Sequence, residues 1–107
     1  MHHTPIKTQH CTTMAEVRRH IDALDDRIVV LMAERSGYVA QAARIKLNAS
    51  AIYDQDRIDF IVSRVGAMAQ AQGAPAAIAQ AAYRALITAS IAFEQSEFAR
   101  LHPEELA

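Results

Sequence analysis

The sequence places a positively charged residue where its own pattern requires an apolar one. Between residues 14 and 45, one set of positions recurs at steps of three and four, the spacing of a single helix face. Every member except Arg35 is apolar or aromatic; the set is Met14, Val17, Ile21, Leu24, Ile28, Leu31, Arg35, Tyr38, Ala42 and Ile45. A guanidinium in a buried seam is costly unless a negative group pairs with it. Arg35 therefore predicts either an ion pair with an acid of another helix or a site for an anionic ligand.

A second cation, Lys46, follows Arg35 by about three helical turns, so both side chains leave the helix on nearly the same side. Their Cα atoms would lie about 16 Å apart. Ala42 stands between them on that side, and its small side chain leaves space for a small anion. This arrangement favours a carboxylate-binding pocket inside a helical bundle.

Arg18 also lies near the apolar side of this helix, but it precedes Arg35 by about 25 Å along the axis. One small molecule cannot contact both residues of one chain. In an antiparallel dimer, however, the partner's arginine at this position would approach Arg35. The alternative is that Arg18 is a surface arginine near the start of the helix.

Three further polar residues could complete a site. Arg57 flanks the apolar face of a second helix, where the alternative is a solvated arginine. Ser90 and Glu94 are spaced by four and share one side of a third helix. Ser90 could instead be a core hydroxyl, and Glu94 could form a purely structural ion pair with Arg35 or Lys46. The excess of positive charge suggests a ligand with more than one carboxylate.

The elements that must position these residues are helices. Thr13 and Glu16 form the pattern of a capping box, and the three-four pattern then runs without proline to Lys46, so the first helix is about 35 residues or roughly 50 Å long. Asp54 is a plausible N-cap for a second helix, which Gly73 ends. Pro75 suits the first turn of a third helix that runs to about Leu101 and is apolar on several sides.

These elements predict an all-α protein with one long helix and two shorter ones. A compact domain of this size has a radius of gyration near 13 Å, so two shorter helices of the same chain cannot cover a rod of roughly 50 Å. The seam needs another apolar surface, and a second copy of the chain would supply it. We therefore expect an intertwined helical homodimer; the alternative is a simple antiparallel coiled coil without a site.

The composition and charge of the chain exclude several classes of function. The chain has 107 residues, enough for one domain, with 11 basic and 12 acidic residues and no basic stripe of the kind that binds nucleic acid. No apolar run approaches the roughly 20 residues that span a bilayer, and the first residues lack the apolar middle of a secretory signal. We expect a cytoplasmic protein, also because the single Cys11 cannot form an intrachain disulfide. The histidines and Cys11 show no ligand spacing that predicts a metal site.

We expect a flexible N-terminal segment over 1–12, a helical domain over 13–101 and a C-terminal tail over 102–107.

The helical domain resembles the all-helical chorismate mutase family, which forms an intertwined dimer of three-helix chains. The matching segments are EVRRHIDALDDRIVVLMAER from Glu16, AARIK from Ala42 and YDQDR from Tyr53. The opening CTTMAEVR is more similar to the isochorismate-pyruvate lyase branch of the family.

The resemblance implies a doubly charged substrate, chorismate or isochorismate, and no cofactor. It implies that Arg18 comes from the partner subunit to hold one carboxylate and that Arg35 holds the other. Lys46 would donate to the ether oxygen of the substrate, and Arg57 would support the site. Ser90 and Glu94 match a serine and a further ether-oxygen residue of the family, and Asp54 and Ile58 would also line the substrate site.

Two positions depart from the family pattern. Bacterial mutases usually carry glutamate after the arginine that matches Arg57, where this chain has Ile58. Both bacterial branches usually have glutamine where this chain has Glu94, although fungal mutases have glutamate. Ile58 favours the lyase, which makes salicylate and pyruvate, whereas Ser90 and Glu94 favour a mutase that converts chorismate to prephenate. We favour the mutase; a non-catalytic helical dimerisation or regulatory module is a third possibility.

Overall fold

The computed structural model describes residues 8–106, and these residues contain three α-helices, two short 3-10 turns and no strand. Helix α1 spans Met14–Ile45, α2 spans Gln55–Ala71 and α3 spans Ala76–Leu101. The short turns are Ala49–Ala51 and Pro103–Leu106. The predicted all-α fold with one long helix and two shorter ones is confirmed.

The helix ends follow from the local sequence. The Thr13 hydroxyl accepts a hydrogen bond from the Glu16 amide at 3.2 Å, which satisfies one of the free amides at the start of α1. The Asp54 carboxylate does the same for the Arg57 amide at 3.0 Å at the start of α2. Helix α2 ends where Gly73 adopts φ 77°, a left-handed conformation that glycine reaches without strain. Pro75 stands at the N-cap of α3, immediately before its first turn.

Helix α1 has 32 residues and ends at Ile45, slightly short of the roughly 35 residues that the sequence predicted. Lys46 is the C-cap; its amide donates to the Ala42 carbonyl at 2.9 Å, and its ψ of 141° turns the chain out of the helix. The Ser50 hydroxyl hydrogen-bonds the Asn48 side chain in the following short turn. Such local side-chain bonds compete with continued helix, which explains the early end.

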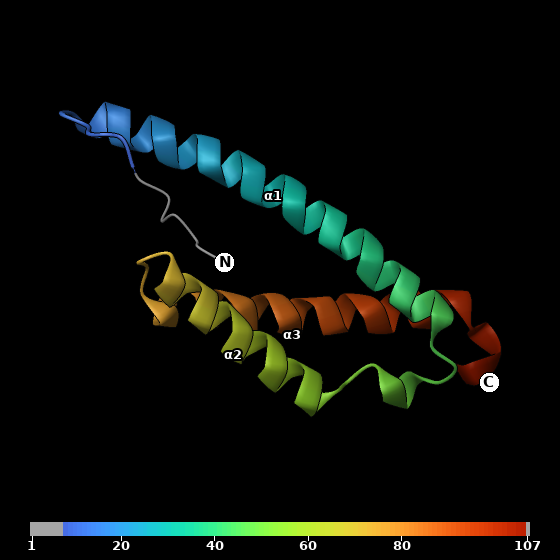
Figure 1. Ribbon diagram of the computed structural model, residues 1–107. Coiled ribbons are helices and arrows are strands. Elements are labelled where there is room, and N and C mark those ends of the chain that lie inside the picture. Colours follow the sequence, from blue (N-terminus) through green and yellow to red (C-terminus); the bar gives the residue numbers. More distant parts are fainter. Residues whose placement is uncertain (1–7, 107) are drawn as a thin grey trace.

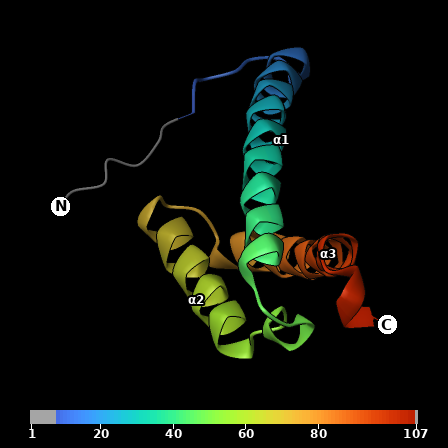
Figure 2. The same ribbon diagram turned by 90° about the vertical axis from the view of Figure 1, so that its right-hand side faces the viewer.

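Helix α3 lies at the centre of the fold and packs against both other helices (Figure 1). Helix α1 meets α3 near its own C-terminal end, and its N-terminal half stands clear of the α2–α3 pair in both views (Figures 1 and 2). A small core forms at the meeting point, where Ala43, Ile52 and Phe98 are buried together. The core thus fixes the end of α1 that carries Arg35 and Lys46.

The chain is elongated, with extents of 60 × 29 × 23 Å and a radius of gyration of 17.7 Å. A compact chain of this length would have a radius near 13 Å. The predicted seam of α1 is largely uncovered within the chain: Ile21, Leu24, Ile28 and Leu31 are each at least half exposed. Within residues 8–106 of a single chain, a continuous apolar helix face therefore has no packing partner.

Helix α3 is apolar enough, by length and composition, to cross a membrane, although only 6% of its most apolar window is buried within the chain. The central helix of a bundle has the same composition because it is covered on several sides.

Residues 1–7 of the predicted N-terminal segment, and residue 107 of the predicted tail, lie outside the described residues, and the predicted domain boundaries stay a prediction.

Candidate active site

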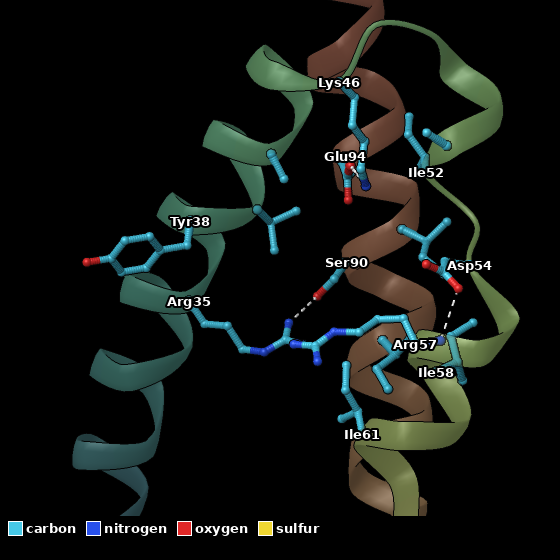
Figure 3. A pocket seen from close by; sticks show the side chains of 15 residues that line it. Arg35, Tyr38, Lys46, Ile52, Asp54, Arg57, Ile58, Ile61, Ser90 and Glu94 are labelled. Carbon is cyan, nitrogen blue, oxygen red and sulfur yellow. Dashed lines mark hydrogen bonds and ion pairs between the residues drawn. The ribbon is translucent and has the colours of Figure 1, made fainter.

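A cavity of about 470 Å³ lies where the C-terminal third of α1, the start of α2 and the middle of α3 meet (Figure 3). This volume is in the range of small-molecule sites. Its lining combines charged groups with an apolar wall: Arg35, Tyr38, Val39, Ala42, Lys46, Ala51, Ile52, Asp54, Arg57, Ile58, Ile61, Ile87, Ser90, Ile91 and Glu94. The cavity therefore brings together every residue of the predicted site except Arg18.

Arg35 enters the cavity from α1, and its Nη1 donates a hydrogen bond to the Ser90 hydroxyl of α3 at 3.0 Å. The ion pair with an acid of another helix, which the sequence left open, does not form within the described chain, where no carboxylate lies within ion-pair distance of Arg35. The contact with Ser90 leaves the charge of the guanidinium uncompensated, and it aims the side chain across the cavity.

Arg57 enters from the first turn of α2, and its guanidinium points toward that of Arg35 (Figure 3). It also lies over the Phe60 ring, 5.3 Å from the centroid, which is a cation–π distance. Among its described contacts, the Asp54 carboxylate accepts only from the backbone amide of Arg57, so it fixes the start of the helix without neutralising the Arg57 side chain. Two like charges directed at one space are unfavourable unless an anion lies between them.

Lys46 and Glu94 form the other charged part of the lining. The Lys46 Nζ donates to the Glu94 Oε2 at 2.5 Å, and the two side chains are 28% and 10% exposed. The structural ion pair that the sequence offered as one possibility for Glu94 is thus present. An ammonium carries three protons for donation, so one bond to Glu94 leaves Lys46 two further donors for a ligand.

The apolar wall was only partly predictable. Ile58 lies beside Arg57 as expected, and Val39 and Ala42 lie between Arg35 and Lys46. Tyr38 and Ile52 line the cavity but were not among the predicted site residues. Tyr38 follows Arg35 by three positions on the same seam, which is a usable signal. Ile52 lies between α1 and α2, and the sequence does not define the path of that connection.

Arg18 does not line this cavity. It is exposed on the N-terminal part of α1, about 25 Å along the helix from Arg35. Its contribution from a second chain stays a prediction.

Among the described residues, no three His, Cys, Asp or Glu side chains gather as metal ligands would.

Comparison with known proteins identifies a family for the segment that contains the cavity. The sequence model of one family, chorismate mutase type II, matches residues 17–95, a segment that holds every residue lining the cavity. No curated protein matches the chain. The matched segment spans most of the 107 residues and runs from the first turn of α1 into the C-terminal half of α3. The chain therefore belongs to the chorismate mutase type II family, and this membership indicates an enzyme of the chorismate mutase class.

Proposed function

We propose that the protein converts chorismate to prephenate by a pericyclic rearrangement inside this cavity. The observation that carries the proposal is that the guanidinium groups of Arg35 and Arg57 face each other with no carboxylate partner among residues 8–106, next to a lysine with free donors. Such a set fits a small molecule with two carboxylates and a developing negative charge on its ether oxygen. The reaction needs no covalent intermediate and no cofactor.

Each group has a separate task in this mechanism. Arg35, held by Ser90, would bind one substrate carboxylate with its planar pair of donors. Lys46 would donate to the ether oxygen as the carbon–oxygen bond breaks, which lowers the barrier because the charge grows only in the transition state. The apolar side chains of Val39, Ile52 and Ile61 would hold the substrate in a compact conformer, with its reacting ends close together.

A second candidate is the isochorismate-pyruvate lyase reaction, which uses the same cations. Ile58 favours it: this apolar residue lines the cavity beside Arg57, where a mutase would usually bind the substrate hydroxyl with glutamate. One assay distinguishes the two reactions. The purified chain is supplied with chorismate or with isochorismate, and the products are identified as prephenate, or as salicylate and pyruvate.

We expect a bicyclic diacid that mimics the mutase transition state to raise the melting temperature by several degrees, because it binds only the folded protein. Arg35→Ala should abolish this shift, whereas Arg44→Ala, which changes an exposed cation of the last turn of α1, should retain it. Absence of a shift, together with no turnover of either substrate, would instead support a non-catalytic helical module.

The proposed enzyme is a homodimer in which each cavity receives Arg18 from the partner chain. The support is the uncovered apolar face of α1, which carries Ile21, Leu24 and Ile28 on the same helix as Arg18. Burial of that face against a second copy would remove it from water and bring the N-terminal part of one α1 over the cavity of the other. A second carboxylate of the substrate would then have its own guanidinium.

Glu94 provides a test of the mechanism. It can donate to the ether oxygen only when it carries a proton, because an ionised carboxylate only accepts. A glutamine amide always has N–H donors. We therefore expect Glu94→Gln to turn over chorismate faster than the wild type in steady-state assays at neutral pH, because the amide can donate to the developing charge.

The matched control is Glu97→Gln, because Glu97 lies on the same helix and pairs with Arg100 outside the cavity. This control should keep the wild-type rate of turnover. A Glu94→Gln variant that is no faster than the wild type would contradict a role of residue 94 as a donor to the ether oxygen.

A further inference from the structure

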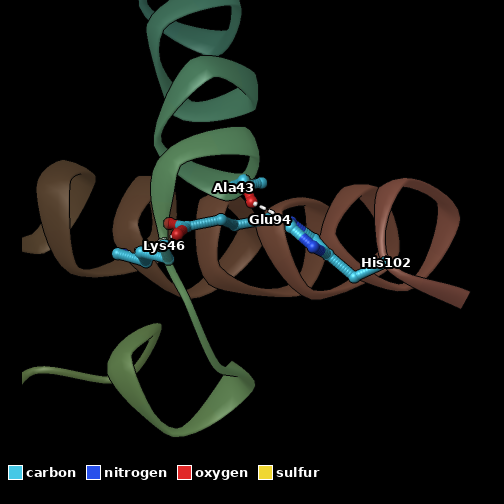
Figure 4. Close-up of polar contacts among 4 residues, drawn as sticks. All are labelled: Ala43, Lys46, Glu94 and His102. Atoms are coloured by element: carbon cyan, nitrogen blue, oxygen red, sulfur yellow. Dashed lines mark hydrogen bonds and ion pairs between the residues drawn. The ribbon is translucent and has the colours of Figure 1, made fainter. Parts of the chain in front are cut away.

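The C-terminal end of α1 is held by one stripe of α3. Glu94, Phe98 and His102 follow one another at intervals of four residues, so they lie on one side of the helix and at its C-cap. Glu94 bonds Lys46, Phe98 is buried against Ala43, and His102 lies against the last turn of α1 (Figure 4). The stripe thus connects the proposed catalytic lysine to a histidine outside the cavity.

His102 supplies a hydrogen bond that the helix lacks. Its Nε2 lies 3.1 Å from the carbonyl oxygen of Ala43, one of the last carbonyls of α1, which have no partner within the helix. A carbonyl oxygen only accepts, so Nε2 must carry the proton and donate. Ala43 is fully buried, and an unpaired carbonyl there would be costly because water cannot replace the donor.

The imidazole is itself held in place. Its ring stacks on Phe98 with the centroids 4.2 Å apart and an angle of 25° between the planes, and Phe98 is almost completely buried. On the other side, Nδ1 faces the Glu104 carboxylate at 4.0 Å. These contacts fix the direction of the Nε2 donor toward α1.

We propose that His102 is a positioning residue for Lys46. Lys46 follows Ala43 by three residues, caps α1 and turns the chain out of the helix, and Leu47 beyond it is 85% exposed. The Lys46 backbone is therefore anchored through the last turn of α1, which packs against Phe98 and which His102 ties to α3 by a hydrogen bond. The inference rests on the proposed function, because it assigns His102 to the reaction through the ammonium of Lys46.

His102→Phe tests this role, because phenylalanine keeps the stacking on Phe98 and removes the donor. We expect kcat to fall about tenfold to a hundredfold, since a displacement of about 1 Å at a reacting group has effects of this size. KM should change little, because Arg35 and Arg57 are not moved. His102→Gln, which retains an N–H donor, should recover part of kcat, and Arg100→Gln, at an exposed position of the same helix turn, should match the wild type.

Two measurements separate positioning from a general loss of stability. In a Lys46→Ala background, His102→Phe should have no further effect on kcat, because its effect passes through Lys46. The Lys46 amide, which donates to Ala42, should exchange its hydrogen about tenfold faster in His102→Phe, while amides in the middle of α3 stay unchanged.

Three results would overturn the proposal: an unchanged kcat in His102→Phe, an equal loss of kcat in both backgrounds, or unchanged exchange at Lys46. If the wild-type chain turns over neither substrate, the proposed function fails. The exchange comparison then still decides whether His102 orders Lys46.

Discussion

Lys46→Ala is expected to lower kcat by about two to three orders of magnitude, with a smaller change in KM. In the proposed mechanism, Lys46 donates to negative charge that develops during the reaction, whereas the arginines bind carboxylates that are charged throughout. A donor to developing charge contributes mainly to the transition state, so its removal appears in kcat. Steady-state kinetics on the substrate that the wild type accepts would measure the effect.

The variant also leaves Glu94 without its partner in a site where that side chain is 10% exposed. An unpaired buried carboxylate destabilises a fold, so melting curves should accompany the kinetics and rates should be taken well below the midpoint. Arg44→Ala is the matched control, because it removes a cation of the same helix turn that does not line the cavity. A Lys46→Ala enzyme with nearly wild-type kcat would exclude Lys46 as the donor.

Mixing two inactive variants should restore activity. Arg18→Ala and Arg35→Ala homodimers each lack an arginine in both proposed sites, so each should lose most of its kcat/KM. A mixed dimer has one site that lacks both arginines and one site that retains both. Random exchange of subunits makes half of the dimers mixed, which predicts recovery of about one quarter of the wild-type activity.

The experiment requires unfolding and refolding the two variants together, with each variant refolded alone as the control. Activity that stays at the level of the separate variants after confirmed subunit exchange would show that Arg18 does not act in the partner's site. An Arg18→Ala homodimer with wild-type kinetics would also show that Arg18 does not act in the partner's site. Sedimentation of the wild type as single chains at the assay concentration would contradict the dimer itself.

The fold was predictable to a large extent because its signals are local. The three-four spacing of apolar residues, the N-caps Thr13 and Asp54 and the left-handed Gly73 each act within one or two helical turns. The convergence of Arg35 and Lys46 was predictable for the same reason, since a rigid helix fixes their relative direction. The later end assigned to α1 reflects the usual uncertainty at helix termini.

The pairing of charges across helices was not predictable in the same way. The sequence could not decide whether Glu94 would pair with Arg35 or with Lys46, because the pairing depends on where along α1 the helix α3 packs. The structure selects Lys46 and gives Arg35 the Ser90 hydroxyl. His102 was assigned to a tail, and its bond to Ala43 depends on the same packing of α1 on α3.

The uncovered face of α1 has a consequence for how the chain reaches its native state. A helix of 32 residues that packs on its own chain at one end only must keep its other half helical by intrinsic propensity, which is marginal in water. In the proposed dimer, ordering of that half and encounter with a second chain become one bimolecular step. The rate at which newly synthesised chains reach the native state would then increase with their concentration. A cell that makes few copies would contain partly ordered, inactive monomers.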